Sequence, residues 1–266
     1  MLESPLNALP LGCGRKLNPR IAAAEALQLI GGFSQPEWLC RIAPQFKRFR
    51  EDIGKVPWFH GAYGVRILTN NQLDVAYRRL RSAPSTRQAV ITLWQPEFDT
   101  EDGHLDYPCT VALNFRLGGT QYRQHDQLDM QVLMRSNDAW LGLPYDMFQF
   151  TQLQLTLCNA LNANPGTYTH TAWSMHLYRS DLDRSYDVTD TLEPATLLPH
   201  VRGFGVPGEQ LSEACDRARR TALQTINNPT ESEKWYLDTL RAFPVNVAPD
   251  PGGDGARAGE AQPVHP

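Results

Sequence analysis

The sequence predicts an α+β fold, because strand-like and helix-like segments occur without the regular alternation of a doubly wound sheet. The strand evidence is a change to β-branched, aromatic or alternating residues at positions 89–94, 111–117 and 128–134, which predicts antiparallel strands. The helix evidence is the apolar residues that recur every three or four positions from Met147 to Leu161, which predict a long buried helix.

The remaining elements carry weaker but consistent signals. The segment Arg20–Ile30 is rich in Ala and Leu, begins after Asn18-Pro19 and ends before Gly31-Gly32, which are typical helix start and stop signals. By the same periodicity we expect further helices at 70–80, 210–223 and 232–242, and a further strand at 167–178.

Length and composition predict one domain with a tail. A chain of 266 residues that is 41% hydrophobic and 20% charged can bury a substantial core. After Phe243 the residues are mostly Pro, Gly, Ala and charged, with little to bury. We therefore expect a single domain over residues 1–243 and a disordered tail over residues 244–266.

Charge and cysteine usage restrict the possible partners. A formal net charge of −4 gives no broad basic field, so we expect neither nucleic-acid nor membrane-surface binding. No long apolar stretch or signal-like N-terminus is present, which predicts a soluble, cytoplasmic protein. The five cysteines are scattered, with no CxxC pair, so we expect reduced thiols rather than disulfides or structural zinc.

Several short motifs point to a known superfamily. They are Tyr107-Pro108-Cys109-Thr110, the block RSNDAWLGLPYD over residues 135–146, and His176-Leu177-Tyr178. The block is similar to the RSxDxxLGxPxN signature of the thymidylate synthase superfamily, which the chain resembles from about residue 15 to about residue 183. The resemblance implies a mixed or antiparallel sheet with a long buried helix, a homodimer formed through the sheet, and one-carbon transfer to a pyrimidine nucleotide.

The resemblance assigns chemical roles to residues that suit them. It implies that Cys109 is the nucleophile that adds to C6 of the base, as a thiolate favoured by a nearby guanidinium. Arg135 would contact both the nucleotide phosphate and the cysteine region. Glu25 would organise water and relay protons, and a carboxylate in an apolar helix is costly unless it is satisfied. Tyr63 would assist removal of the C5 proton.

The same resemblance implies substrate and cofactor contacts. Ser136 would lie near the phosphate, and Asp138 would contact the pterin of the folate. His176 and Tyr178 would bond the sugar 3′-hydroxyl, because residues i and i+2 of a strand share a face. Arg15 occupies the position of a lysine near the folate.

The phosphate site departs from the family pattern. Arg87 matches one arginine of a pair that reaches the neighbouring site across the dimer, and guanidinium groups suit phosphate oxygens. Gln88 replaces the second arginine of the pair, and the N-terminal arginine loop of the family has no counterpart in its usual place. We therefore expect phosphate binding that is weakened, or rebuilt with Arg15 or Arg116.

The base-recognition position also departs from the family pattern. Thymidylate synthases have asparagine where this chain has Asp146, and an amide can accept from uracil N3–H and donate to O4. An aspartate can accept from the N4 amino group of cytosine and, when protonated, donate to N3, as in deoxycytidylate hydroxymethylases. Thr110, in place of a histidine that follows the family cysteine, also indicates a change of base.

Together these features predict a homodimeric 5-hydroxymethylase of a cytosine nucleotide, CMP or dCMP, that uses 5,10-methylenetetrahydrofolate and needs no metal. Within the family, a cytidylate methylase and a thymidylate synthase variant stay open. A nucleotide-binding paralogue without catalysis is a third alternative. The last is an unrelated hydrolase in which Cys109 pairs with His170 or His176.

Overall fold

The computed structural model describes residues 17–34, 37–53, 56–118, 126–186 and 201–241. Arg15, Cys13 and the tail expected over residues 244–266 lie outside these ranges. The helices are α1 (Pro19–Gly31), α2 (Glu37–Ile42), η2 (Pro44–Phe49), α3 (Tyr63–Leu68), η3 (Thr69–Asn71), α4 (Gln72–Ser82), α5 (Pro96–Asp99), α6 (Leu143–Leu161), α7 (Arg179–Tyr186), α8 (Leu211–Ala222) and α9 (Glu231–Leu240). The strands are β1 (Glu51–Ile53), β2 (Val56–Trp58), β3 (Val90–Thr92), β4 (Thr110–Leu117), β5 (Gln127–Asp138) and β6 (Asn164–His176).

The main sheet is mixed, with the strand order β3-β4-β5-β6. The pairs β3/β4 and β4/β5 are antiparallel, as the pattern over residues 89–134 predicts. The pair β5/β6 is parallel. Helix α6 connects the two strands and returns the chain to the end of the sheet where β5 begins, so β6 runs in the same direction as β5. The predicted α+β class with a mixed sheet and a long buried helix is confirmed.

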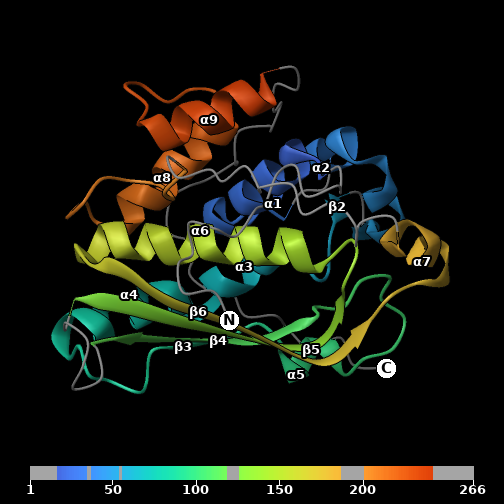
Figure 1. Cartoon of the computed structure of the whole chain (residues 1–266), viewed down its shortest axis with the longest axis horizontal. Helices are drawn as coiled ribbons and strands as arrows, with labels where there is room; N and C mark the ends of the chain where they lie inside the picture. The colour runs from blue at the N-terminus through green and yellow to red at the C-terminus, as the bar shows by residue number, and fades with distance from the viewer. Residues whose placement is uncertain (1–16, 35–36, 54–55, 119–125, 187–200, 242–266) are drawn as a thin grey trace.

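Helix α6 lies between the sheet and the other helices (Figure 1). It packs on β5 and β6 on one side and on α1 on the other, and α8 packs on both α1 and α6. Its residues from Phe148 to Cys158 are all buried, which is the pattern of a helix covered on every side. None of the described helices has the length and apolar character needed to cross a membrane.

The predicted boundaries of α1 rest on identifiable caps. The Asn18 side chain accepts a hydrogen bond from Arg20 N at 3.0 Å, and Pro19 occupies the first helical turn. Gly32 ends the helix at a positive φ of 74°, a conformation that glycine adopts without strain. Local sequence therefore fixes where α1 starts and stops, and with it the position of Glu25.

The face of the sheet opposite α6 has no covering helix among the described residues (Figure 1). It exposes large apolar side chains from both edges of the sheet. Trp173 is 92% exposed, Met175 48% and Val90 42%. An exposed apolar surface of this kind marks a contact site more often than a free surface.

A close helix contact places Tyr63 beside α1. A Cβ on Gly64 would lie 2.1 Å from the backbone oxygen of Gln28, so only glycine permits this approach. The contact brings the start of α3 against the helix that carries Glu25.

We predict that Gly64→Ala destabilises the protein by about 1–3 kcal/mol, the range found for overpacked cores. Helix propensity alone predicts the opposite sign, because alanine is the better helix former. The free energy of unfolding from urea denaturation measures this change. Gly31→Ala is the matched control and should lose less, because the atoms nearest its Cβ belong to the Phe33 side chain rather than to the backbone. Equal or greater stability of Gly64→Ala would contradict the packing argument.

Candidate active site

A single cavity collects the four residues predicted to be catalytic. It lies where α1, α3 and the start of α6 meet the segment before β4. Cys109, Glu25, Tyr63 and Asp146 all line it. The chain brings these side chains together from positions up to 121 residues apart in the sequence, and their chemical roles stay predictions.

Cys109 is half-buried at the end of the segment that leads into β4. Burial raises the pKa of its thiol, the Arg135 guanidinium lowers it, and the carboxyl groups of Asp146 and Asp106 raise it further. The net pKa is above the ordinary value. Arg135 therefore lowers the thiol pKa as expected, but burial raises it by more. Formation of the thiolate then requires a proton acceptor.

Glu25 and Tyr63 face the cavity from the first and third helices. Burial, followed by the charge of Asp146, raises the pKa of each group well above its ordinary value. The Tyr63 ring stacks on Phe150 at 5.6 Å between centroids, which fixes its orientation. Within the described residues, Glu25 Oε2 and the nearby Gln28 Nε2 are buried without a hydrogen-bond partner. These orphaned atoms are suited to a ligand or ordered water.

Asp146 lies in the first turn of α6 and is buried. Its Oδ2 accepts from Asn137 Nδ2 at 2.7 Å, and its Oδ1 accepts from Gln149 Nε2 at 3.0 Å. Burial raises its pKa to about 7 although both amides lower it. Asp146 thus changes charge in the neutral range, where it can act as an acceptor or as a donor.

Asp106 is a cavity residue that sequence reasoning missed. Its Oδ2 accepts from Gly61 N at 3.1 Å, and burial raises its pKa to about 6. A signal was present, since an acidic residue three positions before the candidate nucleophile influences its ionisation. Gln149 and Gln28 were also missed, because glutamines in helices usually face solvent.

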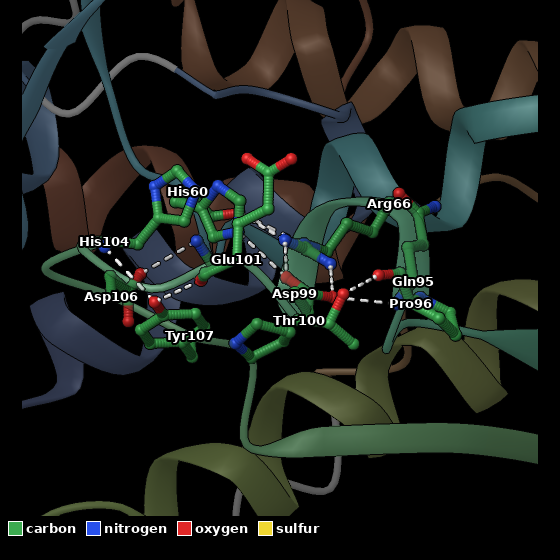
Figure 2. A network of polar contacts seen from close by, with 12 residues as sticks. His60, Arg66, Gln95, Pro96, Asp99, Thr100, Glu101, His104, Asp106 and Tyr107 are labelled. Carbon is green, nitrogen blue, oxygen red and sulfur yellow. Dashed lines mark hydrogen bonds and ion pairs between the residues drawn. The ribbon is translucent and has the colours of Figure 1, made fainter.

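A polar network beside the cavity anchors the segment that carries Cys109 (Figure 2). Arg66 Nη1 and Nη2 donate to Asp99 Oδ2 and Oδ1 at 2.6 and 2.8 Å, a bidentate buried pair. His60 Nε2 lies 2.8 Å from Asp99 Oδ1, and the His60 ring stacks on His104 at 3.6 Å. Burial raises the pKa of Asp99, but its hydrogen bonds from Arg66 and Gln95 leave it below the ordinary value.

The network continues toward the nucleophile. His104 Nδ1 lies 3.0 Å from Glu51 Oε2, and the edge of the Tyr107 ring contacts both stacked histidines. Tyr107 is two residues before Cys109. The network therefore ties β1, α3 and α5 to the start of β4, and so restricts the position of the Cys109 backbone.

The residues predicted to contact the sugar and the phosphate are not among those that line the cavity. Its volume of about 150 Å³ is below the roughly 300–1,000 Å³ of sites for larger ligands, so a nucleotide must extend beyond it. Arg135 Nε donates to Pro108 O at 3.1 Å, beside Cys109. Ser136 Oγ lies 3.4 Å from His176 Nδ1, and the His176 and Tyr178 rings meet edge to face at 5.0 Å.

The structure does not bring every predicted residue to this cavity. Asp138 Oδ1 accepts from Trp140 N at 2.8 Å, and Asp138 does not line the cavity. Arg87 is exposed between α4 and β3, at the end of β4 remote from Cys109, and lines a separate hollow with Arg116. Arg15 lies outside the described residues.

One wall of the cavity has residue types that suit a folate. Beside Cys109 the wall is apolar and aromatic, with Phe46, Phe49, Phe59 and Leu39, and it also carries the orphaned Gln28 amide. Such a wall suits the flat rings of a folate, because aromatic surfaces stack and the amide supplies a polar contact. The residues present therefore fit a folate, although Asp138 does not contribute to this wall.

A cysteine–histidine pair is absent from the described residues. His170 uses both ring nitrogens, with Tyr168 OH at 2.8 Å and Asn137 Oδ1 at 3.1 Å, and His176 lies against Ser136. The hydrolase alternative requires a histidine bonded to Cys109, and neither candidate has that contact. The four cysteines of the described residues are free thiols, as expected.

Solved structures resemble this fold. The thymidylate synthase of phage T4 aligns with a TM-score of 0.60 and 20% identity over 76% of each chain. Thymidylate synthase A of Bacillus subtilis aligns with a TM-score of 0.55 and 22% identity over 69% of this chain and 67% of that one. These similarities establish the fold.

Curated relatives include proteins of two kinds. A deoxyuridylate hydroxymethyltransferase of Bacillus phage SP01 is 27% identical over 67% of this chain and 48% of its own length. One of Pseudomonas phage M6 is 26% identical over 81% and 62%. A thymidylate synthase of Mycoplasma pneumoniae is 27% identical over 58% and 51%. The chain thus spans about half to three fifths of the length of these relatives.

The family model described as thymidylate synthase matches residues 3–199. This range contains the cavity, its polar network and the motif block that carries Asp146. Because the match covers most of the 266 residues, the chain belongs to the thymidylate synthase family.

Proposed function

We propose that this chain transfers a one-carbon unit to C5 of a cytosine nucleotide, CMP or dCMP, and releases the 5-hydroxymethyl nucleotide. The observation that carries the proposal is Asp146, a buried carboxyl group that shares the cavity of Cys109. A carboxylate accepts from the cytosine N4 amino group, whereas the asparagine of thymidylate synthases matches uracil. A buried site built for one pattern rejects the other, because mismatched groups stay unpaired.

The chemistry begins with Cys109. Its Sγ adds to C6, and the thiol proton passes to a cavity carboxylate, for which Asp106 is suited because its pKa of about 6 leaves it ionised at neutral pH. Glu25, whose pKa burial raises, would relay protons to the base. C5 then bonds to the one-carbon unit and loses its proton through Tyr63 and ordered water. The two C–N bonds that join this unit to the folate would break, and tetrahydrofolate would leave with its nitrogens protonated. Water supplies the hydroxyl group, and Sγ leaves C6. Because the last bond to the one-carbon unit is formed by water rather than by hydride, the reaction needs no oxidant or reductant.

5,10-Methylenetetrahydrofolate supplies the one-carbon unit when bound. The aromatic residues Phe46, Phe49 and Phe59 would hold its rings against the cavity. In this arrangement the role proposed for Asp138 becomes indirect, since its carboxylate is used by the Trp140 backbone. Arg15 stays a candidate for the outer part of the folate.

A uracil nucleotide is the second candidate substrate. Relatives named deoxyuridylate hydroxymethyltransferase favour it, and they share the hydroxymethyl product. An ionised Asp146 could accept from uracil N3–H, while an amide of Asn137 or Gln149 donates to O4. The hydroxymethyl product is therefore common to both candidates, and the base distinguishes them.

We also propose a homodimer formed through the uncovered face of the sheet. That face carries Trp173 and Met175, and Arg87 borders a hollow on the sheet rather than the cavity of its own chain. Arg87 would then meet the phosphate bound by the partner subunit. Gln88 leaves room for Arg116, which lines the same hollow, to take the place of the second arginine.

We predict that Asp146→Asn shifts the base preference toward a uracil nucleotide. An amide in place of the carboxyl group accepts from N3–H and donates to O4. Dissociation constants for dCMP and dUMP, measured on the variant and the parent, give the ratio, which should change by at least about tenfold for one charge-assisted hydrogen bond. An unchanged ratio in a folded variant would remove the base argument.

The shared site predicts complementation between variants. Arg87→Ala and Cys109→Ala homodimers should each be inactive or weak, because each dimer lacks one required group in both sites. Mixed dimers should recover up to half of the parent activity, since one of their two sites is complete. Turnover assays on dimers purified with two different tags test this. Verified mixed dimers without recovered activity would argue for a self-contained site.

A further inference from the structure

A chain of hydrogen bonds leads from the core to Asp146. Tyr168 OH lies 2.8 Å from His170 Nδ1, and His170 Nε2 lies 3.1 Å from Asn137 Oδ1. Asn137 Nδ2 then donates to Asp146 Oδ2 at 2.7 Å. This series of hydrogen bonds runs from β6 to β5 and ends on α6, so it links three elements around Asp146.

The direction of every bond in this chain follows from Tyr168. Its side chain is fully buried, and His170 Nδ1 is the one hydrogen-bond acceptor that the described residues offer its hydroxyl group. The hydroxyl must therefore donate to Nδ1, which leaves the proton of the neutral imidazole on Nε2. Nε2–H donates to Asn137 Oδ1, and the Asn137 amide is fixed with Nδ2 toward Asp146.

The opposite direction leaves a buried donor unpaired. If Asp146 were protonated and donated to Asn137 Oδ1, the amide would have to turn and donate to His170 Nε2. His170 would then carry its proton on Nδ1 and donate to Tyr168, whose own hydroxyl proton would have no acceptor among the described residues. A buried donor without a partner is disfavoured.

We propose that Tyr168, His170 and Asn137 form a relay that holds Oδ2 of Asp146 as a hydrogen-bond acceptor, which makes His170 and Asn137 positioning residues for base recognition. The inference rests on the proposed function and refines it. Asp146 reads an N–H group of the base, which is N4–H for cytosine. Gln149 Nε2, which already donates to Asp146 Oδ1 and lines the cavity, keeps a second proton for the neighbouring acceptor, N3 of cytosine.

Burial supports a neutral relay. Desolvation lowers the pKa of His170 to about 4, so the ring carries one proton at neutral pH. The ionisable groups that face Asp146 from the surrounding elements are Glu25 of α1, Tyr63 of α3, Cys109 before β4, Asp138 of β5 and Tyr168 of β6. Because these groups lie beside Asp146, pH effects are assigned by comparing relay variants with the parent protein.

The first test needs no nucleotide. In the full chain labelled with ¹⁵N-histidine, the ring signals of His170, identified by their loss in His170→Phe, should show protonated Nε2 and unprotonated Nδ1 at neutral pH. A His170 ring that is protonated on Nδ1, or doubly protonated at neutral pH, would overturn the relay. This readout stands even if the chain binds no pyrimidine nucleotide, which would refute the proposed function instead.

The second test measures base discrimination. Calorimetry gives the preference for dCMP as the dissociation constant of dUMP divided by that of dCMP, and His170→Phe should reduce that ratio about tenfold, as expected for one hydrogen bond to a charged group. The pKa of Asp146 should rise without the fixed Asn137 donor. As the pH is lowered, the variant should therefore lose binding that needs the carboxylate at a higher pH than the parent does.

Matched variants separate positioning from damage to the fold. His170→Gln with Tyr168→Phe restores a donor to Asn137 and removes the orphaned hydroxyl, so it should recover most of the discrimination. Tyr236→Phe removes a hydroxyl that is buried without a partner in the described structure, and it should leave the ratio unchanged. An unchanged ratio in a folded His170→Phe protein, or a ratio that falls equally in Tyr236→Phe, would contradict the relay.

Discussion

The burial of α6 on every side is the constraint from which the rest of the site follows. A helix between a sheet and other helices must satisfy each polar side chain inside the protein, because no water is at hand to do so. Asp146 does this through Asn137 and Gln149, and Gln152 accepts from the backbone N–H of residue 203. Gln154 Nε2 donates to a backbone oxygen of the sheet, while its Oε1 is buried without a partner among the described residues. Desolvation then moves the pKa of Asp146 into the neutral range. One packing requirement thus positions Asp146, the proposed base-recognition residue, and adjusts its charge.

Burial acts on the neighbouring groups in the same direction. Glu25, Asp106 and Cys109 all hold their protons more tightly than in water, so the cavity favours neutral groups over charged ones. Arg135 opposes this only at Cys109 and Asp106, where its guanidinium is close. The cavity therefore gathers carboxyl, thiol and phenol groups whose pKa values burial raises. The buried Arg66–Asp99 pair shows the alternative solution, in which two full charges compensate each other beside the site.

The sequence predicted the features that depend on local pattern. The long helix, the strands and the caps of α1 come from periodicity and from residues such as Asn18 and Gly32, which act on their own neighbours. The parallel pairing of β6 was not predictable in this way, because its local pattern is shared with antiparallel strands. The short helices α2, α3 and α5 and the β1–β2 hairpin contain too few residues for a period to be recognised.

The site shows the same division. Cys109 and Asp146 were found because motifs mark them, Glu25 and Tyr63 because the family resemblance assigns them roles, and all four line one cavity. The Asn137–His170 contact joins residues 33 positions apart, and His60–Asp99 joins residues 39 apart, so neither follows from local spacing. Asp106 adjoins a motif but belongs to none. Arg87 and Asp138 match motifs, yet their side chains lie elsewhere in this chain, so their roles depend on a partner subunit or on indirect contacts.

The central claim is that Cys109 activates C5 of a cytosine nucleotide. Tritium release from C5-labelled CMP, dCMP and dUMP in the presence of 5,10-methylenetetrahydrofolate, with mass analysis of the nucleotide product, tests it most directly. The account predicts release from a cytosine nucleotide, a gain of one hydroxymethyl group, and no release with the Cys109→Ala variant. Release from dUMP alone would contradict the assignment of the base, and release from none of the nucleotides would contradict the proposed reaction.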